Sequence, residues 1–234
     1  MSTGSPGSPG LFALVLLADG RFPTGGHAHS GGFEAAAAAG RVHDVPTLEA
    51  FLRGRAATAG CTSAAFTAAT CAALARGTAD ECDGLDAELD ARTPAPALRA
   101  ASRALGRQLL RAARAVRPDA ALDALAAAWP HGPHQPIALG ASARVFGLGP
   151  RTAAVAALHE AVTGPATAAV RLLGLDPFAV HAALARLGPL LEELADAAAG
   201  SARTPPRDLP ALSAPMLDIS AEDHATWEVR LFAS

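Results

Sequence analysis

Lysine is absent from this chain of 234 residues, and the formal net charge is only −3. A P-loop needs a Gly-Lys-Ser/Thr sequence at the start of a helix, so the absence of lysine excludes this kind of phosphate site. The arginines are scattered along the chain, and a nearly neutral chain has no electrostatic footprint for nucleic acid. The composition therefore argues against P-loop nucleotide hydrolysis and against nucleic-acid binding.

Cysteine is also scarce, and no two cysteines form a Cys-x-x-Cys pair. The chain has 3 of them, Cys61, Cys71 and Cys82. An odd number of widely spaced cysteines fits a reducing compartment, in which each acts as a small buried hydrophobic residue. We expect no cysteine-based metal or redox chemistry.

Long apolar runs are missing. The longest, Leu11–Ala18, is far shorter than the ~20 residues that span a bilayer. No basic residue precedes this run and no cleavage site follows it, so a secretory signal is not expected. The sequence predicts a cytoplasmic protein without membrane contact.

Signatures of an enzyme active site are missing as well. There is no Gly-x-Ser-x-Gly elbow, and Ser30 is close to His29 and Asp19 only along the chain, which does not make a triad. The carboxylates gather in one expected solvated segment, around 80–90, rather than in pairs suited to acid–base catalysis. We expect a protein that is not an enzyme.

Helix formers dominate what is present. Alanine is abundant, aromatic residues make up 4% of the chain, and β-branched strand formers are sparse. We predict an all-α fold, a single-domain bundle of roughly eight to ten helices. Its expected parts are a flexible N-terminal tail over 1–10, a helical domain over 11–199 and a C-terminal tail over 200–234. The expected helices cover 30–39, 44–60, 62–76, 97–116, 119–128, 137–147, 150–163, 166–173 and 177–199, with a short one after Ser220, and the acidic segment 78–96 is an exposed helix or loop.

The stretch 16–34 interrupts the helical pattern. It breaks at Asp-Gly, turns through Pro-Thr-Gly-Gly (23–26), presents His-Ala-His-Ser (27–30) and re-enters a helix at Glu34. Pro23 fixes the entry of the turn, and glycine permits backbone angles that residues with a Cβ avoid. We therefore expect a loop that is tight or closely approached by another chain. Its glycines are Gly25, Gly26, Gly31 and Gly32.

His27 and His29 are the obvious metal candidates, because imidazole binds borderline cations such as nickel or zinc. A closed site needs three or four ligands, and further histidines (His43, His131 and His134) would have to come from elsewhere in the fold. A structural or partner-contact role is the preferred interpretation. The alternatives are a metal-dependent helical enzyme and a nickel store, both using His27 and His29.

An arginine stripe follows one face of the helix predicted over 97–116. Its members, spaced by four, are Arg99, Arg103, Arg107 and Arg111. Like charges at this spacing destabilise an isolated helix by ~0.2–0.5 kcal/mol per pair. Either the acidic segment 80–90 folds back over the stripe, or an acidic partner covers it.

The C-terminal segment 218–234 is unusually apolar for a chain end, since chain ends are normally polar and frayed. Large apolar residues in it and just before it are Met216, Leu217, Ile219, Trp227, Val229, Leu231 and Phe232. Such a segment must dock on its own core or on a partner.

Three blocks of the chain resemble the urease accessory protein family UreF. They are Phe22-Pro23-Thr24-Gly25-Gly26 with His29-Ser30 and Gly32-Phe33-Glu34; Pro136-Ile137-Ala138-Leu139-Gly140 with Ala168-Ala169-Val170-Arg171-Leu172; and Ala214-Pro215-Met216-Leu217-Asp218-Ile219 with His224 and Arg230-Leu231-Phe232. The first and last blocks are specific, whereas the middle block alone would be weak. His27 departs from the family pattern, which more often has an aromatic residue there, so the two histidines look incidental.

The resemblance implies a non-enzymatic, all-helical chaperone of urease activation without a cofactor of its own. Such a protein is a homodimer that binds the accessory protein UreD (also called UreH) and recruits the GTPase UreG, which brings nickel to apo-urease. An arginine finger would be the means of acting on that GTPase, but no arginine stands out. The implied partner-binding residues are Asp19, Arg21, Pro23, Gly25, Gly26, His29, Ser30, Gly32, Glu34, Asp218, His224, Trp227, Arg230, Leu231 and Phe232. We expect 218–234 to order on the UreD-type partner, so its deletion should spare the fold and abolish partner binding.

Overall fold

The computed structural model describes residues 10–232, apart from the side chain of His27. In chain order its α-helices are α1 (Gly10–Ala18), α2 (Phe33–Ala38), α3 (Val45–Arg55), α4 (Cys61–Arg76), α5 (Glu81–Ala91), α6 (Pro96–Val116), α7 (Ala120–Ala128), α8 (Gln135–Val145), α9 (Pro150–Leu173), α10 (Pro177–Gly200) and α11 (Pro215–Ala225). Short helical turns are η1 (Gly26–Ala28), the π-helical η2 (Ala56–Gly60) and η3 (Pro206–Asp208). Residues 10–232 contain no strand, which confirms the all-α prediction. The tail expected over 1–10 lies outside the described residues, except for Gly10, which begins α1.

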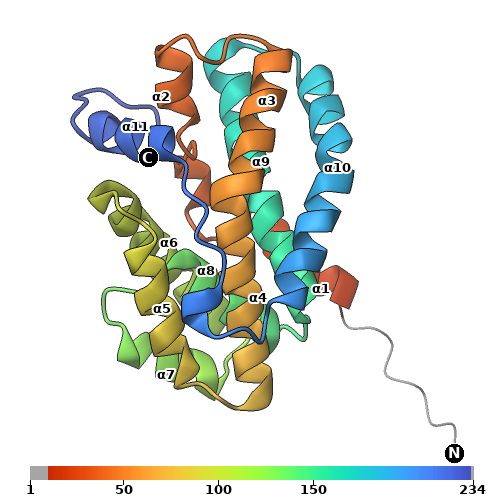
Figure 1. Cartoon of the computed structure of the whole chain (residues 1–234), viewed down its shortest axis with the longest axis vertical. Helices are drawn as coiled ribbons and strands as arrows, with labels where there is room; N and C mark the ends of the chain where they lie inside the picture. Colours follow the sequence, from red (N-terminus) through yellow and green to blue (C-terminus); the bar gives the residue numbers. More distant parts are fainter. Residues whose placement is uncertain (1–9, 233–234) are drawn as a thin grey trace, which may run out of the picture.

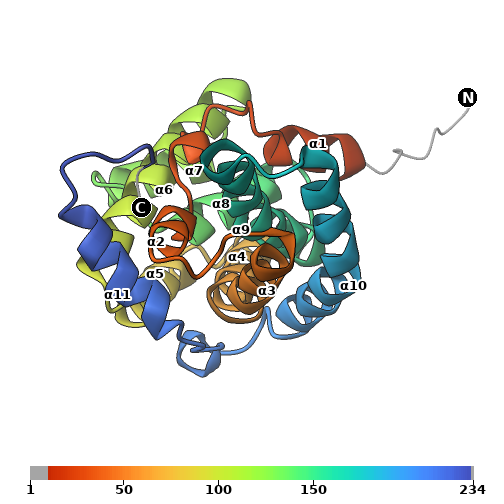
Figure 2. The same cartoon turned by 90° about the horizontal axis from the view of Figure 1, so that it is seen from above.

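Helices α4, α8 and α9 form the middle of the bundle, and the other helices surround them (Figures 1 and 2). The largest core cluster joins α1, α4, α6, α7, α8 and α9. A second cluster lies between α2, α3, α9 and α10, and it includes Phe232 from the C-terminal end. Many of the buried residues are alanines, so neighbouring helix backbones approach one another closely.

The continuous helix Val45–Arg76, made of α3, η2 and α4, is long and apolar enough to cross a membrane by length and composition. However, 67% of its most apolar window is buried inside the bundle. There α4 packs on α8, α9 and α10. Its apolar surface is used in the core.

Several helix boundaries follow from local signals, as predicted. The Asp44 carboxylate accepts a hydrogen bond from Thr47 N at 2.9 Å and caps α3, while Gly77 ends α4 with φ +77°. Pro96 occupies the first turn of α6, where a missing N–H costs nothing. The Asp119 carboxylate accepts from Ala121 N at 2.8 Å at the start of α7. Local capping chemistry therefore sets these ends.

The prediction of separate helices over 150–163 and 166–173 is wrong, because α9 runs unbroken through Pro165. A proline inside a helix has no N–H for the carbonyl four residues earlier, here that of Ala161. The Nε of Arg55 donates to that carbonyl at 3.0 Å. A donor from α3 thus replaces the missing hydrogen bond, and the helix continues.

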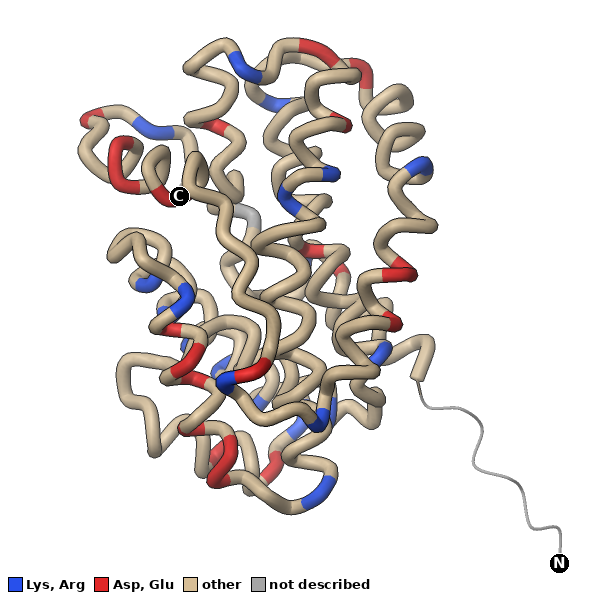
Figure 3. The backbone as a smooth tube through the Cα atoms, viewed as in Figure 1, with Lys and Arg blue, Asp and Glu red and all other residues tan. Residues whose placement is uncertain are grey.

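The acidic segment forms α5, and it is not simply solvated as expected. Its inner face is buried, including the Asp86 carboxylate at 4% exposure. Arg103 donates to Asp86 at 3.1 Å and to Asp90 at 2.7 Å, and Arg99 lies 3.9 Å from Asp90. Acidic and basic positions alternate where α5 meets α6 (Figure 3). The acidic segment therefore covers this part of the arginine stripe, whereas Arg107 donates to the carbonyl of His131.

The cysteines are free thiols, and Cys71 and Cys82 are buried. Burial raises the pKa of Cys71 to about 11 and that of Cys82 to about 12. Both behave as small hydrophobic residues, as the sequence predicts.

Candidate functional site

The loop between α1 and α2, residues 19–32, is shaped by glycines at positive φ. These angles are +78° at Gly25, +61° at Gly31 and +85° at Gly32, whereas Gly26 is not among the positive-φ glycines. The expected freedom is therefore used at Gly25, Gly31 and Gly32, and the expectation for Gly26 is wrong. A Cβ at Gly25 would collide with the Gln108 side chain of α6, and one at Gly32 would lie 2.9 Å from Leu217 of α11. The loop thus packs closely on both helices.

Glu34, in the first turn of α2, connects this loop to the C-terminal segment. Its carboxylate accepts hydrogen bonds from His224 Nε2 at 2.9 Å, from Leu231 N at 2.9 Å and from Phe232 N at 3.1 Å. Glu34 is 8% exposed and His224 is 2% exposed. Burial alone would raise the pKa of Glu34, but the hydrogen bonds from Leu231, His224 and Phe232 outweigh it, so the pKa is lowered. The carboxylate is held ionised beneath the surface.

Further contacts fix α11 beside α2 and α6. The Arg41 guanidinium donates to Ser220 Oγ at 2.9 Å, and Glu222 Oε1 accepts from Ala97 N at 2.8 Å. The Phe232 ring is buried in the cluster that contains Phe33. We therefore revise the expected effect of deleting 218–234, because the deletion would open a hydrophobic core and remove the partners of Glu34.

The residues expected to bind partners divide into an internal set and an external set. Ser30, Glu34, His224 and Phe232 are buried, and Ser30 Oγ accepts from Glu34 N at 3.2 Å. Gly25, Gly32, Asp19, His29, Asp218 and Trp227 are partly buried, and Arg21, Pro23, Gly26, Arg230 and Leu231 are exposed. Asp19 accepts from Arg21, and the Trp227 ring lies 4.7 Å from that of His224. The buried residues hold the loop and the C-terminal segment in place. The exposed residues of the same two segments lie on the surface.

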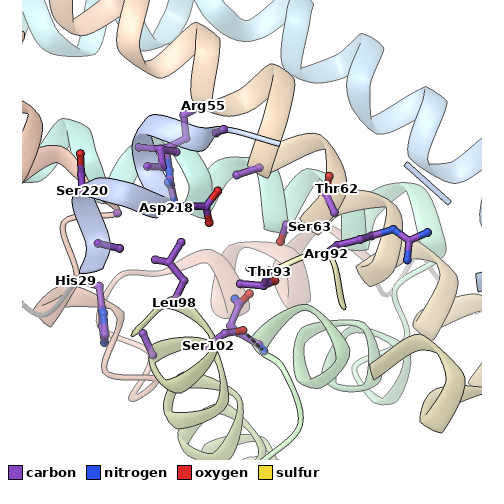
Figure 4. Close-up of a pocket in the computed structure, with 18 of the residues that line it drawn as sticks. His29, Arg55, Thr62, Ser63, Arg92, Thr93, Leu98, Ser102, Asp218 and Ser220 are labelled. Atoms are coloured by element: carbon purple, nitrogen blue, oxygen red, sulfur yellow. Dashed lines mark hydrogen bonds between the residues drawn. The ribbon is translucent and has the colours of Figure 1, made fainter. Parts of the chain in front are cut away.

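Two cavities lie beneath the loop. The first, of about 260 Å³, is bounded by the loop, α4, α6 and α11 (Figure 4), and the second, of about 410 Å³, is bounded by the loop, α1 and α9. Residues that line both are His29, Gly31, Arg55, Ala59, Ser63, Leu105 and Gln135. Their shared wall comes from the loop, from the continuous helix made of α3, η2 and α4, and from α6 and α8.

Ser102, His134 and Asp90 form a network that the sequence analysis missed. His134 Nδ1 lies 3.0 Å from Ser102 Oγ, and His134 Nε2 lies 3.0 Å from Asp90 Oδ1. The order of groups resembles a catalytic triad, but Ser102 Oγ also accepts from Gln135 N, and Asp86 accepts from His134 N. Burial lowers the pKa of His134. These side chains cap the first turn of α8, which is a structural task.

No group of three or more His, Cys, Asp or Glu side chains that could hold a metal ion occurs among the residues the structure describes. The side chain of His27 is outside that set. His29 lies on the wall of both cavities, and His131 and His134 are at the start of α8. Among the described side chains, the geometry therefore brings no three-ligand set to His29.

Glu160, on the wall of the second cavity, is expected to make stability depend on pH. Burial raises its pKa to about 7, against a hydrogen bond from Gln135. The native state then holds a proton that the unfolded chain releases near pH 4.5, so this group makes the protein less stable as the pH rises towards 7. Glu160→Gln should stabilise the protein by about 2 kcal/mol at pH 8, and the gain should vanish near pH 4.5. Urea unfolding across this range tests it, with Glu193→Gln, an exposed glutamate of α10, as the control. Equal pH profiles for all three proteins would contradict it.

Fold and site together define an all-helical protein whose N-terminal loop and C-terminal segment meet on one buried carboxylate. The family model of UreF matches residues 42–188. A protein of Mycolicibacterium vanbaalenii named urease accessory protein UreF is 46% identical over 226 residues, which are 96% of this chain and 99% of that protein. The protein of the same name from Mycobacterium tuberculosis strain H37Rv is 43% identical over 225 residues, 96% of this chain and 99% of its own. The chain belongs to the UreF family of urease accessory proteins, which confirms the resemblance seen in its sequence.

Proposed function

We propose that this protein is a cytoplasmic scaffold for urease maturation rather than an enzyme. In this proposal it forms a homodimer, binds a UreD/UreH-type accessory protein and through it recruits a UreG-type GTPase to apo-urease for nickel insertion. Its relatives are named accessory proteins. The observation that carries the proposal is the junction at Glu34, which holds an apolar chain end on the surface of the bundle.

The surface beside that junction has the composition of a binding site. Val229 is 82% exposed and Leu231 is 74% exposed, close to Arg230, and on α11 Ile219 is 61% and Met216 is 54% exposed. Grouped exposed apolar side chains with a polar rim are typical of protein–protein contacts. We infer that this surface takes the UreD-type partner and that Arg230 pairs with a carboxylate there.

The proposal predicts that Val229→Asp with Leu231→Asp abolishes co-purification with the UreD-type partner. Burial of one large apolar side chain contributes about 1.5–3 kcal/mol, so the double change should weaken binding at least ~100-fold. Both side chains are exposed, so the thermal unfolding transition should not move. The measurement is co-expression with the urease structural and accessory proteins, followed by pull-down and urease activity.

Phe178→Asp is the matched control, because Phe178 is 86% exposed on α10 and should tolerate the change. Full partner recovery by the double variant would overturn the placement of the surface. His27→Ala separates the scaffold from the metal-dependent alternatives: the scaffold predicts retained activation, because the family pattern does not require histidine at this position. Loss of activation together with loss of bound nickel in equilibrium dialysis would favour a nickel site instead.

A further inference from the structure

Arg55 is a partly buried, charged side chain, and its role in the fold uses only part of its guanidinium. It is the last residue of α3, immediately before the π-helical turn η2, and such turns are frequent at functional sites. Its Nε donates to the carbonyl that Pro165 leaves unpaired. The terminal nitrogen atoms, Nη1 and Nη2, make no hydrogen bond or ion pair with any residue in the described part of the chain.

The loop packs closely against this guanidinium. A Cβ at Gly31 would lie 3.0 Å from Arg55 Nη2, 3.1 Å from Arg55 Cζ and 3.2 Å from Pro165. Gly31 also has φ +61°, so both the backbone conformation and the close approach of Arg55 favour glycine here. Arg55 therefore sits under the loop and on the wall of both cavities.

The charge of Arg55 is not compensated by the carboxyl groups that line the cavities. Glu160 accepts from Gln135, Asp19 accepts from Arg21, and the pKa of Asp218 is raised by burial with no effect of Arg55. Burial lowers the pKa of Arg55 to about 10, so it is still cationic at neutral pH. Arg55 is partly buried, and a charge that loses part of its hydration without gaining a counter-ion is unfavourable.

Arg92 shows the contrast within the first cavity. Its guanidinium pairs with Glu88 and donates to the carbonyl of Arg207 at 2.9 Å. The terminal nitrogens of Arg55 have no such partners among the described residues. The hydroxyl of Ser63 lies on the same shared wall and is directed into the cavity in Figure 4. Guanidinium and hydroxyl donors together suit an acceptor with several oxygen atoms.

We propose that Arg55, with Ser63, binds a small oxyanion such as a carboxylate, phosphate or sulfate in the cavities beneath the loop. The anion neutralises the guanidinium, and its oxygen atoms accept from the terminal nitrogens in the two-point geometry that arginine offers. Cavities of about 260 Å³ and 410 Å³ leave room for such an ion with water.

The test separates this role from the structural bond to Ala161. Pro165→Ala supplies α9 with its own N–H, so Arg55 is no longer needed to complete that helix. Thermal unfolding is followed while sodium formate, acetate, phosphate or sulfate is titrated against sodium chloride at equal ionic strength. We expect a saturable rise in Tm of roughly 5–10 °C at a hundredfold excess over Kd in the wild type, in Pro165→Ala and in the control Arg53→Gln, an exposed arginine of the same helix.

The rise should be absent in Pro165→Ala with Arg55→Gln. An equal rise in that double variant, or no saturable rise in the wild type, would overturn the proposal. If the double variant does not fold, Arg55→Lys in the Pro165→Ala background decides, because lysine keeps the charge without the planar fork. At least tenfold weaker anion binding by the lysine variant supports the site, and unchanged binding overturns it.

Discussion

Gly140→Ala is expected to destabilise the protein by about 3 kcal/mol, at the upper end of the usual cost of overpacking, or to prevent its folding, because α8 crosses α4 at this residue. A Cβ there would overlap the carbonyl oxygen of Thr67 and would lie 2.7 Å from Thr70 Cβ and 3.1 Å from Cys71 N. Two of these atoms belong to the backbone of α4, so no side-chain rotation relieves the overlap. Urea unfolding and the yield of soluble protein measure the effect.

Gly54→Ala is the matched control for this substitution. Gly54 lies in α3, within the continuous helix Val45–Arg76, and an added Cβ meets nothing within 4 Å. Alanine should therefore stabilise this helix by about 0.5–1 kcal/mol, because the unfolded chain loses conformational freedom. A similar loss of stability in both variants would show that close helix packing at Gly140 is not the cause.

The contrast between these glycines shows how far the sequence predicts the fold. Helix ends that depend on neighbouring residues, such as the cap at Asp44 and the stop at Gly77, were predictable because their chemistry is local. Nothing near Gly140 in the sequence shows that alanine would not fit there, since the need for glycine comes from another helix. The continuity of α9 was likewise hidden, because its missing donor comes from Arg55, 106 residues away.

The candidate site was partly predictable for the same reason. The loop and the C-terminal segment stand out by their glycines and by their apolar residues at a chain end. The point where the two segments meet does not stand out, because Glu34 and His224, which form it, are 190 residues apart in the sequence. Ser102, His134 and Asp90 come from α6, the turn before α8 and α5, and no spacing rule connects them. Sequence patterns thus identified the segments, and only packing showed which of their residues are internal supports.

Glu34→Ala is expected to release the C-terminal segment and to abolish partner binding although Glu34 is itself buried. The substitution leaves His224 Nε2 and the N–H groups of Leu231 and Phe232 without their acceptor. Each buried unsatisfied donor costs about 1–3 kcal/mol, and removal of one partner of a buried pair costs about 3–5 kcal/mol. Detachment of residues 215–232 avoids most of this cost, because the donors then bind water.

We therefore expect Glu34→Ala to detach the C-terminal segment under conditions in which the rest of the protein is still folded. Amide hydrogen exchange of 226–232 should become fast in Glu34→Ala, the unfolding midpoint should fall, and co-purification with the UreD-type partner should be lost. Glu228→Ala, an exposed glutamate of the same segment, should leave all three unchanged. If Glu34→Ala frees the segment but keeps full partner binding, the partner orders the segment by itself and the junction is not needed. If exchange stays slow, the carboxylate does not hold the chain end, because the packing of Phe232 in the cluster that contains Phe33 is then sufficient.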